Sequence, residues 1–153
     1  MSESEPIPAI TIWQPWAWWL TWGWKTIETR KHHFLRSLEG RWIAIHAARH
    51  FDRDALSVAR PYLRDHQVSR TQQVFRDRRY GQGRVLCLAH VAEHRLLTAA
   101  DSPAALCPAE DLYGLVIDKR QLLDGCLDAR GAPGIWHWTP PADARFQLPE
   151  TTP

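Results

Sequence analysis

Residues 23–30 place three charged side chains at a spacing that can bind or transform a polar ligand. They read Gly-Trp-Lys-Thr-Ile-Glu-Thr-Arg, so Lys25, Glu28 and Arg30 fall within six consecutive positions. Arg30 offers a planar fork for a phosphate or a base edge, and Lys25 offers a compact cation. Glu28 can accept a hydrogen bond from the amino group of a base. The structural interpretation stays open too, since Glu28 and Arg30 share one face of a predicted strand and can form an ion pair that stabilises the fold.

Aromatic side chains precede this motif. Six of the nine tryptophans lie within residues 13–24, and Gln14 and Trp16 stand at the predicted strand-to-helix turn. The ring of Trp16 can stack on an unpaired base or fill the core, and the sequence favours neither. A place in the core is predicted for four of the others: Trp18, Trp19, Trp136 and Trp138.

His46 ends a predicted strand and is a candidate to line the same site as a hydrogen-bond donor or proton shuttle. A histidine whose ring nitrogens form hydrogen bonds within the core explains this residue equally well. His46 and His50 are four residues apart, but the helical context and the adjacent Glu of a zinc motif are missing. We therefore predict no metal site, and no cofactor is expected.

Positive charge gathers in the middle of the chain. Residues 25–84 hold fourteen Lys/Arg against six Asp/Glu, a net charge of +8, whereas the whole chain carries +2. A basic segment of this kind suits a polyanion, although it can also simply keep a protein soluble. The candidates for contacts with a nucleic-acid backbone are Arg70, Arg76, Arg78 and Arg79.

Length and composition exclude several classes of protein. The chain has 153 residues, 44% hydrophobic and 24% charged, which fits one globular domain and excludes a disordered or fibrous chain. No apolar run is long enough to span a membrane, and no secretory signal is visible, so a cytoplasmic location is expected. Three cysteines without a Cys-x-x-Cys pair indicate reduced thiols.

Alternating apolar residues predict five or six strands, separated by two to four short helices. The expected strands span residues 10–13, 26–30, 41–48, 84–94, 113–118 and 134–138. A helix is expected over residues 16–22. Because regular helical crossovers are missing, an α+β fold is expected, in the form of a small, mostly antiparallel β-barrel. The domain is expected to span residues 10–138, with tails over 1–9 and 139–153 and a helical insertion over about 49–80.

The pattern Gly-x-Lys-x-x-Glu-x-Arg closely resembles the ASCH domain, a branch of the PUA-like superfamily. It follows Gln14-Pro15-Trp16-Ala17 and precedes the segment from Gly40 to Ala48, and further similar segments follow at residues 83–89, 113–117 and 131–138. The resemblance implies a PUA-like barrel whose cleft, beside the first helix, carries the charged residues of the motif. It also implies binding of RNA, of single-stranded nucleic acid more generally, or of a nucleotide-like small molecule. The expected ligand-binding residues are Gln14, Trp16, Lys25, Glu28, Arg30 and His46.

Two other functions stay open. Some relatives in the family resemble hydrolases of acetylated cytidine or of RNA, in which Lys25 and Glu28 would be the catalytic pair. Those hydrolases carry a Thr three residues after the Lys, a position that Glu28 occupies here, so the expected hydroxyl nucleophile is missing. A protein-interaction module that docks a partner on exposed tryptophans is the third possibility.

Overall fold

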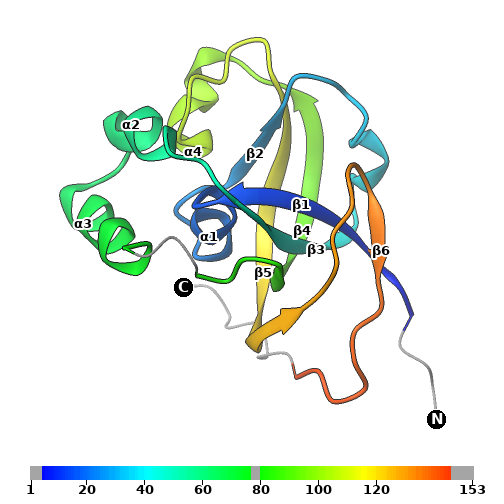
Figure 1. The fold of residues 1–153 in the computed structure, drawn as a ribbon. Coiled ribbons are helices and arrows are strands. Elements are labelled where there is room, and N and C mark those ends of the chain that lie inside the picture. Colours follow the sequence, from blue (N-terminus) through cyan, green and yellow to red (C-terminus); the bar gives the residue numbers. More distant parts are fainter. Residues whose placement is uncertain (1–4, 77–79, 146–153) are drawn as a thin grey trace.

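The computed structural model describes residues 5–76 and 80–145, which form one mixed β-sheet and several short helices (Figure 1). The strands are β1 (Ile7–Gln14), β2 (Ile27–Arg30), β3 (Trp42–Phe51), β4 (Arg84–Leu96), β5 (Tyr113–Asp128) and β6 (Trp136–Trp138). The α-helices are α1 (Trp16–Thr21), α2 (Ala55–Ala59), α3 (Asp65–Val74) and α4 (Ser102–Ala105). Short 3-10 helices are η1 (Arg36–Leu38), η2 (Arg60–Tyr62) and η3 (Ala99–Asp101). In this described part of the chain, no helix combines the length and apolar character needed to cross a membrane.

The strand order of the sheet is β2-β5-β4-β3-β1-β6. β1 and β3 pair in parallel, and the other pairings are antiparallel. This arrangement confirms the predicted α+β class. Within the described residues the hydrogen-bonded order ends at β2 and β6, so the sheet is not closed and the PUA-like barrel stays a prediction.

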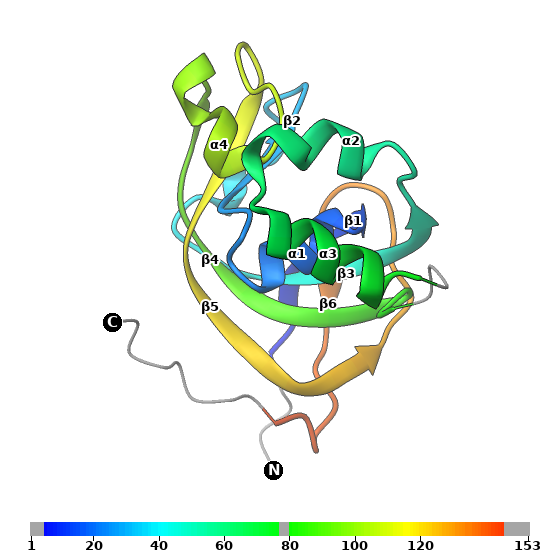
Figure 2. The same ribbon diagram turned by 90° about the vertical axis from the view of Figure 1, so that its left-hand side faces the viewer.

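The two longest strands curve around α1, which lies in the hollow of the sheet (Figure 2). The pairing of β4 with β5 shifts register at three places between Val85 and Glu93. Such bulges bend a strand and increase its twist. The curved sheet packs α1 against its concave side, where Leu20 of α1 and Ile45 of β3 belong to the same buried cluster.

The aromatic helix α1 is buried on more than one side. Trp18 and Trp19 are both buried, and Trp19 Nε1 donates a 3.0 Å hydrogen bond to Thr71 Oγ1 of α3. Trp18 also packs its ring against Phe75, which follows α3. The helical insertion is therefore held on the domain through the tryptophans of α1.

The ends of the domain differ from those predicted. β1 begins at Ile7, so residues 7–9 belong to the sheet, where they pair with β6. Ala9 is fully buried there. At the other end Pro140 is buried, and the carbonyl of Arg145 accepts a 2.8 Å hydrogen bond from the Asp124 N–H. Residues beyond 138 therefore still contact the domain.

Candidate functional site

A cavity of about 380 Å³ lies between the end of β1, the start of α1 and β2. Its volume is near the lower end of the range for small-molecule sites, roughly 300–1,000 Å³. Four predicted ligand-binding residues line it: Trp16, Lys25, Glu28 and Arg30. The remaining lining residues are Thr11, Ile12, Trp13, Thr29, Asp52 and Cys107.

Lys25 lies at the inner end of this cavity and is only 1% exposed. Its Nζ donates a 2.6 Å hydrogen bond to the carbonyl of Ala105 and lies 3.7 Å from Glu28 Oε1. Burial lowers the pKa of the Lys25 ammonium, and the nearby Glu28 carboxylate partly opposes that shift. The backbone carbonyl of Lys25 accepts a 3.2 Å hydrogen bond from Arg120, which fixes the loop that precedes β2.

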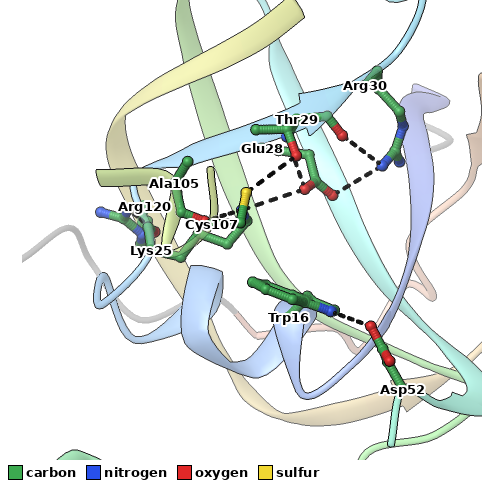
Figure 3. A network of polar contacts seen from close by, with 9 residues as sticks. All are labelled: Trp16, Lys25, Glu28, Thr29, Arg30, Asp52, Ala105, Cys107 and Arg120. Atoms are coloured by element: carbon green, nitrogen blue, oxygen red, sulfur yellow. Dashed lines mark hydrogen bonds and ion pairs between the residues drawn. The ribbon is translucent and has the colours of Figure 1, made fainter. Parts of the chain in front are cut away.

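The Glu28 carboxylate contacts Lys25, Thr29 and Arg30. Besides the Lys25 ion pair, its Oε1 accepts a 3.0 Å hydrogen bond from the Thr29 N–H, and its Oε2 accepts one of 3.2 Å from Arg30 Nη1 (Figure 3). Arg30 NH1 also contacts the Thr29 carbonyl at 3.3 Å, and the Arg30 side chain stays 28% exposed. The ion pair suggested by the sequence is therefore present, and it forms one wall of the cavity.

Aromatic rings form the facing wall. Trp16 lies across the opening from Glu28, and its Nε1 donates a 2.8 Å hydrogen bond to Asp52 Oδ2 (Figure 3). The Lys25 ammonium lies 5.0 Å from the centroid of the Trp16 ring, a cation–π distance. Trp13 lines the cavity too and is 52% exposed, so its ring is accessible at the opening.

Thr29 and Cys107 bring a hydroxyl and a thiol to the same cavity. Thr29 Oγ1 lies 3.8 Å from Cys107 Sγ (Figure 3). Cys107 follows α4 and is a free thiol. The sequence contained no signal for Cys107 or Asp52, because both reach the motif only through tertiary packing from distant segments.

Gln14 lies outside the cavity and has a structural role. It is fully buried, its Oε1 accepts a 2.9 Å hydrogen bond from the Trp18 N–H, and its Nε2 donates to the Tyr80 carbonyl at 3.1 Å. The first bond satisfies one of the free N–H groups at the start of α1. Since both ends of the amide are engaged, Gln14 is not available to a ligand in the small cavity.

His46 also lies outside this cavity and lines a second one, on the other side of Thr11. Its Nδ1 lies 3.1 Å from Thr11 Oγ1, and its Nε2 lies 2.8 Å from the Ala129 carbonyl. Since a carbonyl only accepts, Nε2 carries the proton, and Nδ1 accepts from the Thr11 hydroxyl. His46 therefore fixes the segment around Ala129.

The arginine-rich segment contributes nothing to the small cavity among the described residues. Arg70 and Arg76 are exposed, and Arg70 NH1 donates to Gln73 Oε1 at 3.0 Å. Arg78 and Arg79 lie outside the described residues. The structure thus assembles the charged motif, and neither Arg70 nor Arg76 lines its walls.

Comparison with known proteins does not assign this chain to a family. No family model matches the chain, and no curated protein shows significant similarity to it. Within residues 5–76 and 80–145, no group of three or more His, Cys, Asp or Glu side chains is placed to hold a metal ion.

Proposed function

We propose that this chain is an ASCH-type domain of the PUA-like superfamily whose small cavity binds one base of an RNA, or of a nucleotide-like ligand. The proposal depends on one observation, which is that two different walls face each other across the cavity. Exposed and half-buried indoles form one wall, and the Lys25–Glu28–Arg30 cluster forms the other. Indoles stack on any base, while a carboxylate and a guanidinium read its edge. The resemblance of residues 23–30 to the family motif supports the same assignment.

The polar wall favours a base with an amino group next to an acceptor. A carboxylate has about four acceptor sites, and two intramolecular hydrogen bonds leave Glu28 with capacity for a base amino group. Arg30 has five N–H donors, and the hydrogen bonds that it forms with other described residues use only Nη1. Cytosine fits this arrangement, whereas uracil presents a carbonyl where Glu28 needs a donor. Cytidine should therefore bind more tightly than uridine.

Titration calorimetry with cytidine and uridine tests this function. Trp13→Ala should weaken cytidine binding about 5- to 150-fold, which corresponds to the roughly 1–3 kcal/mol of one base–indole stack. Trp22→Ala is the matched control, because Trp13 and Trp22 are both 52% exposed and Trp22 does not line this cavity. Arg30→Ala should reduce the preference for cytidine over uridine.

Equal affinities of wild type, Trp13→Ala and Arg30→Ala for cytidine would refute the base site. Equal losses of cytidine affinity in Trp13→Ala and Trp22→Ala would also refute it, because the loss would then not depend on the tryptophan that lines this cavity. The protein-interaction alternative loses support from Trp18, Trp19 and Trp138, which are buried in the monomer.

A hydrolase of acetylated cytidine is the second candidate, and Thr29 favours it. The sequence placed no Thr at the position three residues after Lys25, yet the structure brings the Thr29 side chain into the cavity. In that reaction water adds to the acetyl carbonyl, the C–N bond breaks, and acetate and cytidine result. Release of acetate by wild type that is lost in Thr29→Val would favour the hydrolase; binding without acetate release would favour the binding module.

A further inference from the structure

A second, larger cavity of about 870 Å³ adjoins the small one. Thr11 of β1 lines both, and the larger cavity continues over the ends of β3 and β5 and the segment after β5. Two arginines line it, Arg49 of β3 and Arg130, together with Asp128 and His46. The neighbouring Ala48, Ala132 and Pro133 are small or apolar, so the charged groups dominate its chemistry.

The wall of this larger cavity is fixed by interactions within the protein. His46 Nε2 donates to the Ala129 carbonyl, and the Ala129 N–H donates to the Gly83 carbonyl at 3.1 Å. Gly131 packs so closely that a Cβ there would lie 2.6 Å from Thr11 Oγ1. These contacts hold the segment after β5 in place.

The charged groups of the wall divide into those that are paired and those that are not. Asp128 Oδ1 accepts a 3.0 Å hydrogen bond from Arg84 Nε, which offsets its charge. Arg49 and Arg130 are exposed, and neither guanidinium forms an ion pair or side-chain hydrogen bond with another described residue. Two exposed guanidinium groups on a prearranged wall are suited to a phosphate, which they can bind through parallel N–H···O bonds.

We propose that the larger cavity binds the phosphodiester group next to the base held in the small cavity, so that the site takes a single-stranded nucleic acid rather than a free nucleoside. This inference rests on the proposed function, since it needs a base beside Thr11. The nucleic-acid strand would cross β1 at Thr11, and its base would lie between the indoles and the Lys25–Glu28–Arg30 cluster. Its neighbouring phosphate would lie between Arg49 and Arg130.

Fluorescence anisotropy with end-labelled tetracytidylate, in the ribose and deoxyribose forms, tests this second site. The double variant Arg49→Ala/Arg130→Ala should lose about tenfold or more in affinity for both tetramers at low salt, and should keep the wild-type affinity for free cytidine. The slope of log K against log salt should fall by about 0.7 for each phosphate that no longer meets a guanidinium. The control is Arg41→Ala/Arg60→Ala, which removes the same charge from exposed positions that line neither cavity.

The outcomes separate the two proposals. If both double variants bind the tetramers like wild type, or if both lose the same affinity, the phosphate site is refuted and the base site stands. If cytidine does not bind and only Arg49→Ala/Arg130→Ala loses tetramer affinity, the base site is refuted and, with it, the crossing at Thr11; only phosphate binding by Arg49 and Arg130 stands. Should the alanine variant fail to fold, Arg49→Gln/Arg130→Gln keeps the side-chain length without the charge and gives the same readout.

Discussion

Replacing the buried lysine of the site should cost much of the stability of the fold. Lys25→Ala removes the ammonium that donates to the Ala105 carbonyl at 2.6 Å and that lies 3.7 Å from Glu28 Oε1. An orphaned buried carbonyl costs about 1–3 kcal/mol, and breaking a buried ion pair costs about 3–5 kcal/mol. Arg30 still pairs with Glu28, so we expect a loss of about 3–4 kcal/mol in the free energy of unfolding.

Urea unfolding followed by tryptophan fluorescence measures this loss. Lys25→Met should recover part of it, because the methionine side chain refills the volume of the lysine stem. Lys119→Ala is the control: Lys119 is exposed on β5, and surface changes of this kind stay within about 0.5 kcal/mol. A loss below about 1 kcal/mol for Lys25→Ala, with an unchanged m value, would refute the assigned role of this ammonium.

The pH dependence of stability gives an independent check on the same group. Burial lowers the pKa of Lys25 in the folded state below its ordinary value of 10.5, so the unfolded chain binds the proton more tightly. Stability should therefore rise with pH between the lowered pKa and 10.5, by at most about 1.4 kcal/mol per pH unit. Lys25→Met should lack this rise. Parallel curves for wild type and Lys25→Met across that window would contradict the assignment.

Further predictions concern acid stability and the wall of the larger cavity. Hydrogen bonds from Arg95 lower the pKa of Asp101, so this carboxylate stabilises the fold above its ordinary pKa of 3.8 and loses that contribution as the pH falls. Asp101→Asn should make the thermal unfolding temperature less dependent on pH below about 4. Gly131→Ala should destabilise the fold by about 1–3 kcal/mol, because the new Cβ would lie 2.6 Å from Thr11 Oγ1. An unchanged thermal unfolding temperature of Gly131→Ala would contradict this expectation, because it would show that the segment after β5 moves freely to make room for the new Cβ.

The order of the elements could be predicted from the sequence, because it depends on local patterns. Alternation of apolar residues predicted all six observed strands in their order, although β5 runs ten residues past its predicted end at Asp118. The parallel pairing of β1 with β3 and the open edges of the sheet depend on contacts between distant segments. No local pattern encodes them.

The candidate site was predictable where the motif and the neighbouring Trp16 form it. Lys25, Glu28 and Arg30 converge because two of them share β2 and the third lies two residues before its start. Gln14 does not line the cavity with them, because its amide accepts a hydrogen bond from the start of α1, and adjacency in sequence does not show this. Cys107 could not be assigned, because a residue at position 107 reaches the motif only after α4 packs on β2.

The pairing of β1 with β6 has a consequence for how this protein is made. Thr11, which both cavities share, accepts a 3.1 Å hydrogen bond from the indole N–H of Trp136, and β6 covers the outer edge of β1 at residues 7–9. Roughly 120 residues separate the end of β1 from β6, which a ribosome adds in on the order of ten seconds. Throughout that interval the emerging chain presents the outer edge of β1 uncovered, a surface open to strand pairing with other nascent chains.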